Sequence, residues 1–191
     1  MSHLRLFIAF ESPQEVKAKA GEIQDQLRQA HADVSWERHD RLHCTVKFLG
    51  ETPSELVPII ADALLEIGRQ NPPFSVRYRG TGCFPGKRDP RVLWLGIENP
   101  DGRLYSLFRS VEAATSALGI KPETREFHPH LTLGRVRSGR NHGNLLRILE
   151  SVTFESTIIA IHEILLIKSE LRPTGSVYTN IKFVPLVGIS G

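Results

Sequence analysis

Two short segments of the sequence share a pattern of side chains suited to acid–base chemistry. Residues 43–46 read His-Cys-Thr-Val, and residues 130–133 read His-Leu-Thr-Leu. Alternate side chains of a β-strand point to the same face, so each segment would place a histidine beside a threonine, opposite an apolar face. Continued alternation in the first segment would put Lys47 on the histidine's face and Phe48 on the buried one.

Histidine pairs are suited to phosphoryl transfer, because an imidazole can be neutral or protonated near pH 7 and two can act as acid and base. In-line displacement at phosphorus puts the attacking and leaving oxygens on opposite sides. The hydroxyls of Thr45 and Thr132 could donate hydrogen bonds to the non-bridging oxygens, whose charge grows in the transition state. The pattern therefore predicts phosphoryl transfer to water by His43 and His130, without a metal or cofactor. Both histidines look alike in sequence, so the acid is not distinguished from the base.

The other histidines fit no catalytic pattern. His128 precedes Pro129, which restricts it to extended backbone, and the equivalent position of the first motif is Arg41. A metal site with His130 would need a third ligand that the sequence does not offer, so we expect His128 to be structural or to support a residue of the site. We expect the remaining five to be surface or core residues: His3, His31, His39, His142 and His162.

The segments that must position the two motifs alternate between strand and helix patterns. Strands are predicted over 4–10, 34–37, 43–50, 74–84, 92–98, 130–136, 154–169 and 177–186, and helices over 13–30, 52–68, 101–118 and 145–150. Ser12 and Thr52 are each followed by proline and, three residues on, by glutamate, so each is predicted to cap a helix. No linker divides the chain. This mixture predicts an α+β fold in a single domain, residues 1–191.

Composition sets outer limits on function. The chain has 191 residues and a net charge of +3, which favours an anionic partner, although a solvated surface with extra arginines explains it equally. No apolar run reaches the roughly 20 residues of a membrane helix, and no export signal is recognised, so we expect a cytoplasmic protein with no membrane partner. Cys44 and Cys83 form no CxxC pair, so neither a zinc finger nor a disulfide framework is predicted.

The two motifs resemble those of the two-histidine (2H) phosphoesterases. The similarity is closest to the bacterial and archaeal RNA 2′,3′-cyclic phosphodiesterases, first described as 2′-5′ RNA ligases. Supporting segments are RLFIAF (5–10), HCTVKFLG (43–50), FPGKRDPRVLWLGI (84–97), FHPHLTLGR (127–135) and KSELRPTGSVYTNI (168–181). The resemblance implies a bilobal α+β fold with two antiparallel sheets, flanked by helices and related by a pseudo-two-fold axis. Each lobe would bring one motif to a central cleft.

The resemblance also implies an activity. A terminal 2′,3′-cyclic phosphate on RNA would be opened to a 2′-phosphomonoester, with His43 as proton donor and His130 as proton acceptor. Thr45 and Thr132 would bind the phosphate. Related enzymes also join or cleave 2′-5′ linkages. The expected partner is RNA with a cyclic phosphate end, such as a tRNA fragment, and the expected state is a monomer.

Further substrate contacts are less sharply indicated. Phe84 would stack on the terminal base, although core packing explains it as well. Arg88, Arg91 and Arg135 would contact phosphates, although a solvated loop is an equal explanation for them. Strict alternation turns Arg135 away from His130 unless a bulge at Gly134 re-aims it. The alternatives in function are a 2H phosphodiesterase acting on a cyclic nucleotide, a 2′-5′ oligonucleotide or an ADP-ribose cyclic phosphate, and an RNA-binding module without catalysis.

Overall fold

The computed structural model describes residues 2–173 and 175–189, so residues 1, 174, 190 and 191 of the predicted domain lie outside it. In the described part, nine strands and four α-helices follow one another along the chain. The strands are β1 (His3–Glu11), β2 (Val34–Trp36), β3 (His43–Pro53), β4 (Phe74–Phe84), β5 (Val92–Glu98), β6 (His130–Val136), β7 (Ile159–Ile161), β8 (Glu163–Arg172) and β9 (Gly175–Pro185). The helices are α1 (Gln14–Arg28), α2 (Leu56–Gln70), α3 (Arg103–Ala117) and α4 (His142–Ser151), with a 3-10 turn η1 (His39–Arg41).

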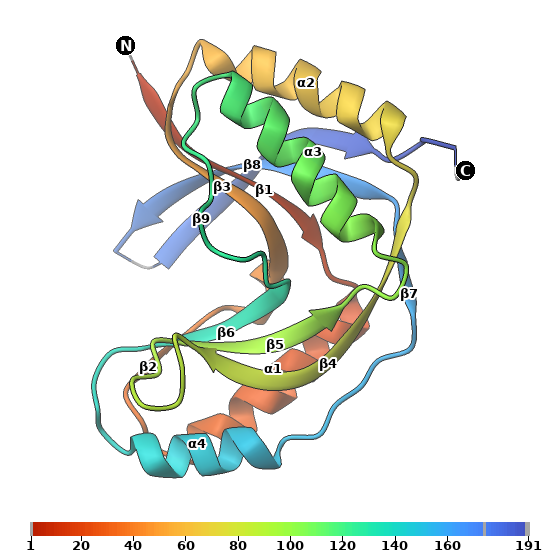
Figure 1. The fold of residues 1–191 in the computed structure, drawn as a ribbon. Coiled ribbons are helices and arrows are strands. Elements are labelled where there is room, and N and C mark those ends of the chain that lie inside the picture. The colour runs from red at the N-terminus through yellow and green to blue at the C-terminus, as the bar shows by residue number, and fades with distance from the viewer. Residues whose placement is uncertain (1, 174, 190–191) are drawn as a thin grey trace.

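All nine strands belong to one antiparallel sheet in the order β7-β4-β5-β6-β3-β1-β8-β9, with β2 paired to β6. The α+β class is therefore confirmed. The two sheets implied by the family resemblance are halves of this one sheet, which curls so that the halves turn toward each other (Figure 1). They join where β3 meets β6, at the pair Cys44 and Leu131.

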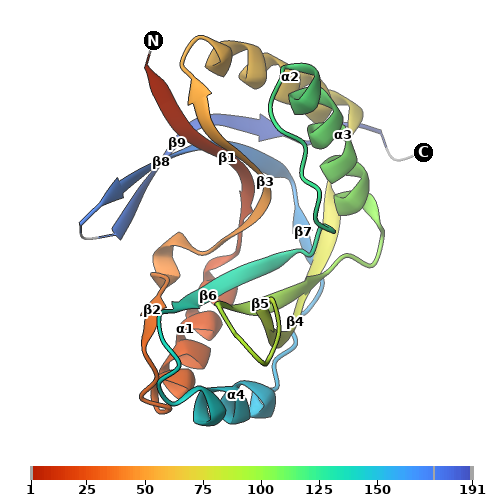
Figure 2. The ribbon, with the colours of Figure 1, turned by 60° about the vertical axis from the view of Figure 1, so that its left-hand side comes forward.

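The helices cover the outer face of the curled sheet. Helices α2 and α3 pack on the half formed by β3, β1, β8 and β9, whereas α1 and α4 lie against the other half (Figures 1 and 2). The main apolar core fills the space between helices and sheet. A smaller apolar cluster lies on the inner face, which is the concave face of the curled sheet, opposite the helices. It consists of Phe7, Ala9, Leu165 and Ile167. No helix within 2–173 and 175–189 is both long and apolar enough to cross a membrane.

Both predicted helix caps are wrong, although the helices themselves form. The hydroxyl of Ser12 is buried and accepts a hydrogen bond from the Tyr78 hydroxyl at 2.9 Å, so it does not cap α1. Thr52 is the penultimate residue of β3 and donates to the Gly50 carbonyl at 3.2 Å, while α2 begins only at Leu56. The predicted strand 154–169 is also corrected: Glu155 forms only an isolated bridge with Arg79, and continuous strands begin at Ile159, as β7 and then β8.

Two β-bulges occupy equal positions in the two motifs. β3 carries an extra residue, Val46, opposite β1, and β6 carries an extra residue, Leu133, opposite β5. A bulge shifts the alternation of side chains by one residue. Lys47 therefore turns outward toward α3, and Phe48 turns to the inner face, where it is 57% exposed. The expectation that Lys47 shares the face of the first histidine and that Phe48 is buried is wrong for this reason.

Candidate active site

The two His-x-Thr motifs meet at the centre of the sheet, because their middle residues, Cys44 and Leu131, are direct antiparallel partners. Both middle residues are fully buried beneath the outer helices. Antiparallel pairing then places each histidine opposite the threonine of the other motif on the inner face. The two histidines are diagonal neighbours, a relation that separates residues by about 7–8 Å in such a pair. The structure thus brings together His43, Thr45, His130 and Thr132.

The same backbone hydrogen bond orients both imidazoles. Nδ1 of His43 lies 2.8 Å from the carbonyl oxygen of Arg41, and Nδ1 of His130 lies 2.6 Å from that of His128. Donation from Nδ1 to a carbonyl leaves Nε2 as the proton-accepting nitrogen of the neutral ring. Positions 41 and 128 are therefore equivalent through their backbone, although one is arginine and the other histidine.

The environment of His43 favours the neutral ring on balance. Burial lowers its pKa below the ordinary value, because the charged form loses solvation. The hydrogen bond to the Arg41 carbonyl and the carboxylate of Glu11 act in the opposite direction. Lys17 and His130 add to the lowering, which also indicates that the two histidines are close enough to interact.

The environment of His130 differs in its charges. Burial again lowers the pKa, and the hydrogen bond to the His128 carbonyl opposes this effect. The ring of His128 and the guanidinium of Arg135 lower the pKa further. Within the described chain no carboxylate raises it, so the two histidines are alike in geometry but not in electrostatic surroundings.

Aromatic rings pack against both imidazoles. Phe7 stacks on His43 with ring centres 4.8 Å apart, and Tyr178 meets the same ring edge-on at 5.3 Å. Phe84 meets His130 edge-on at 5.1 Å. The structure therefore places Phe84 beside His130, and it adds two rings that the sequence did not single out.

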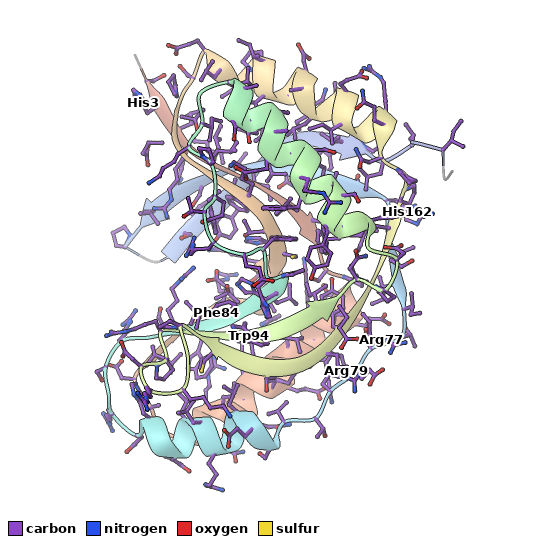
Figure 3. The ribbon with its side chains drawn as sticks, in the orientation of Figure 1. His3, Arg77, Arg79, Phe84, Trp94 and His162 are labelled. Carbon is purple, nitrogen blue, oxygen red and sulfur yellow. The ribbon has the colours of Figure 1, made fainter. Side chains whose placement is uncertain are left out.

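A second aromatic group surrounds the histidine of the β6 motif. Trp94 lies across Gly82 of the neighbouring strand, and a Cβ atom at that glycine would come within 2.2 Å of the indole. Phe84 and Trp94 lie side by side on β4 and β5 (Figure 3), with ring centres 5.4 Å apart. The ring of His128 packs against Trp94 at 5.0 Å and against Phe84 at 5.3 Å. His128 thus belongs to this aromatic group. Across residues 2–173 and 175–189, no three histidine, cysteine or acidic side chains are grouped to hold a metal ion.

The three predicted arginines fall in different places. Strict alternation does not hold in β6: a bulge at Leu133, not Gly134, turns Arg135 to the inner face, close enough to His130 to affect its pKa. Arg88 and Arg91 lie on the exposed loop between β4 and β5, and Arg91 pairs with Asp89 at 2.9 Å. Within the described residues, no side-chain hydrogen bond or ion pair joins either guanidinium to the site, although the backbone N–H of Arg91 donates to the Phe84 carbonyl at 2.7 Å.

A cavity of about 290 Å³ lies beside His43. Its walls come from β1, α1, η1, β8 and β9, and they include Glu11, Lys17, Tyr178 and Asn180. The Lys17 amine lies 3.2 Å from a carboxylate oxygen of Glu11 and 3.4 Å from the carbonyl of Asp40. The sequence analysis missed this ion pair. The alternation of Phe7, Ala9 and Glu11 along the first strand is the signal that could have indicated that Glu11 faces inward.

Comparison with known proteins gives consistent matches. A family model described as LigT-like phosphoesterase matches residues 10–94 and again residues 95–178, so each match contains one motif. A Methanothermobacter thermautotrophicus protein named RNA 2′,3′-cyclic phosphodiesterase is 34% identical over 180 residues, covering 94% of this chain and 97% of the relative. A crystal structure from Thermus thermophilus superposes with a TM-score of 0.81 at 29% identity, covering 97% of this chain and 99% of that one. E. coli LigT complexed with 3′-AMP superposes with a TM-score of 0.70 at 27% identity and the same coverage.

Proposed function

Because this chain belongs to the LigT-like phosphoesterase family, we propose that it hydrolyses a terminal 2′,3′-cyclic phosphate on RNA to a 2′-phosphomonoester. The observation that carries the proposal is the placement of two equally oriented imidazoles as diagonal neighbours on one sheet face, each beside a threonine hydroxyl. Relatives named for this activity align over nearly the full chain, and a LigT structure holds 3′-AMP.

The proposed reaction uses the two Nε2 atoms on opposite sides of phosphorus. Nε2 of His130 accepts a proton from water, whose oxygen forms a bond to phosphorus. The bond between phosphorus and the 3′-oxygen breaks, and protonated His43 donates its proton to that oxygen. The phosphate stays on the 2′-oxygen. Thr45 and Thr132 donate hydrogen bonds to the non-bridging oxygens as their charge grows.

The remaining predicted residues contact the RNA around the reacting group. Phe84 stacks on a base, since its ring borders His130. Arg135 binds a phosphate near the site, and Arg88 and Arg91 attract the more distant backbone from their exposed loop. In this proposal residues 1–191 act as one unit, in which each half of the sheet supplies one motif.

The decisive experiment incubates the purified protein with a short RNA that ends in a 2′,3′-cyclic phosphate and identifies the product isomer. We expect a 2′-phosphate, whereas a 3′-phosphate would contradict the assigned acid and base. A cyclic nucleotide, a 2′-5′ oligonucleotide and an ADP-ribose cyclic phosphate, tested in parallel, identify any preferred alternative substrate.

Variants of the two histidines test the mechanism in the same assay. His43→Ala and His130→Ala should each lower kcat by about 10²- to 10⁴-fold, because each removes one proton transfer. Their circular dichroism should match that of the parent. His162→Ala is the matched control, because this histidine is exposed beyond β7, away from both motifs (Figure 3). Full activity in either motif variant would reject the two-histidine mechanism.

A further inference from the structure

The two histidines have different partners on the strands that flank them. In the pairing of β3 with β1, His43 stands directly opposite Glu11. In the pairing of β6 with β5, His130 stands opposite Gly96, which has no side chain. The motifs, their bulges and their Nδ1 hydrogen bonds are otherwise equivalent. The carboxylate beside His43 is therefore a specific difference between two otherwise equivalent motifs.

Glu11 and His43 face the same space. Directly opposite residues of an antiparallel pair have Cβ atoms about 4.5–5.5 Å apart. Both side chains line the cavity of about 290 Å³, and so does Lys17, whose amine holds a carboxylate oxygen of Glu11 at 3.2 Å. The side chain of Glu11 is 57% exposed and that of Lys17 only 9%, so the buried lysine holds the carboxylate at the cavity wall.

The charged groups around the two rings differ: a carboxylate, Glu11, acts on His43, and among the described residues only cationic or titratable basic groups act on His130. The other titratable or charged groups around His43 are Lys17 from α1, Asp40 and Arg41 from η1, His130 from β6 and Tyr178 from β9. The Asp40 carboxylate is held by Arg38, and the Arg41 guanidinium donates to the Ser176 carbonyl. Glu11 is thus the carboxylate without an arginine partner beside His43. The corresponding groups around His130 are His43, His128 and Arg135.

We propose that Glu11 is a positioning residue that acts through His43 and reserves this histidine for the role of proton donor. The proposal rests on the proposed function and deepens it, because the two motifs alone do not distinguish acid from base. A negative charge stabilises the imidazolium that an acid must be at the start of each turnover. Arg135 destabilises the imidazolium at His130, which must begin each turnover as the neutral base.

The shifts in proton affinity agree with this division. Burial lowers the pKa of both rings, but Glu11 raises that of His43, whereas Arg135 lowers that of His130. The alkaline limb of the pH profile of kcat/KM then reports His43, which must be protonated, and the acid limb reports His130, which must be neutral. Removing the charge of Glu11 should move only the alkaline limb.

The test measures Glu11→Gln by two methods. We expect the NMR titration of the His43 Cε1 proton to shift to lower pH and the alkaline limb of kcat/KM to move with it, with the acid limb unchanged. Activity on the alkaline side should then fall by about threefold or more, while activity on the acid side is kept. Movement of the acid limb instead would make His43 the base and overturn the proposal.

A second variant separates charge from a packing defect. Lys17→Met removes the cation that opposes Glu11, so His43 should titrate at higher pH and the alkaline limb should move upward. Shifts in opposite directions from the two ends of one ion pair are not expected of a structural defect. Glu15→Gln, an exposed residue in the first turn of α1, removes the same charge as Glu11→Gln and should move neither limb.

The outcomes also separate this proposal from the proposed function. An unchanged His43 titration in both Glu11→Gln and Lys17→Met would overturn the role of Glu11, whatever the activity. A responsive titration in a protein that leaves cyclic phosphate ends uncleaved would overturn the proposed function, and with it the donor role.

Discussion

At the scale of single residues, equal motifs carry unequal side chains two positions after each bulged residue. Phe48 and Arg135 each lie five residues after a motif histidine, and the bulges turn both to the inner face. An aromatic ring can stack on a nucleobase, and a guanidinium can bind a phosphate. The substrate is therefore expected to lie across the two halves in one direction only.

Arg135 provides a prediction at this scale. Arg135→Gln should raise KM for a cyclic-phosphate RNA by about 10- to 150-fold, because a hydrogen bond to a charged phosphate contributes about 1.5–3 kcal/mol. Arg69→Gln is the matched control: this exposed guanidinium lies on the outer helix α2 and pairs with Glu66 at 3.0 Å, so KM should change little. Steady-state kinetics on one substrate at fixed salt compare the two. Equal effects would show that general charge, and not inward placement, is what binds the RNA.

The site residues that the sequence predicted are those whose chemistry is visible without neighbours. His43, His130 and their threonines follow from strand alternation within one short segment. Glu11 could not be singled out in the same way, because its importance depends on which strand pairs with β3 and in which register. Arg135 required knowledge of a bulge, which arises between strands and leaves no clear mark in either sequence.

At the scale of elements, local sequence patterns predicted whether a segment is a helix or a strand better than they predicted where it begins and ends. β4 and β5 have the predicted bounds, because their alternating apolar residues are limited by prolines and glycines. The caps failed where a tertiary contact competed: the Ser12 hydroxyl bonds with Tyr78, and Thr52 remains in β3. Sequence signals for a cap assume that the side chain has no better partner, and here both have one.

The outward turn of Lys47 creates a buried ion pair between elements. Its amine lies 2.6 Å from both carboxylate oxygens of Glu112 on α3 and 3.2 Å from the carbonyl of Lys121. The carboxylate also accepts the backbone N–H of Glu123 at 2.9 Å. The pair therefore ties β3 to α3 and to the segment that leads into β6.

Breaking this pair should destabilise the fold. Lys47→Met should lower the free energy of unfolding by roughly 3–5 kcal/mol, because it leaves a partly buried carboxylate without its cation. Lys19→Met is the control, since Lys19 and Glu22 are also 2.6 Å apart but well exposed, and a loss below about 1 kcal/mol is expected there. Urea unfolding monitored by fluorescence measures both. Comparable losses would mean that the ion pair of Lys47 gains nothing from its burial.

At the scale of the whole molecule, the two ends of the chain complete one half of the sheet. β1 lies between β3 and β8, so the half that carries His43 needs strands from the first and last fifths of the sequence. The four residues 164–167 of β8 are buried, with the first and third in the main core and the others in the inner cluster. Both histidine motifs lie outside this C-terminal hairpin.

A chain ending at Ser156 therefore tests cooperativity. It keeps both motifs, but it loses four apolar side chains that contribute about 1.5–3 kcal/mol each, comparable to the 5–15 kcal/mol that holds a typical domain folded. We expect no cooperative urea transition and no activity. Leu171→Ala near the tip of the same hairpin should leave stability within about 0.5 kcal/mol, because that side chain is 69% exposed. A folded, active truncation would show that neither the fold nor the site depends on β8 and β9.

The pairing of Cys44 with Leu131 has a consequence for how enzymes of this design can diversify. At this pair the two histidine motifs lie on neighbouring strands, so strand spacing sets the distance between the two imidazoles. A change of substrate is then expected to involve the residues that contact the flanking sugar and nucleobase, while the distance between the two imidazoles stays the same.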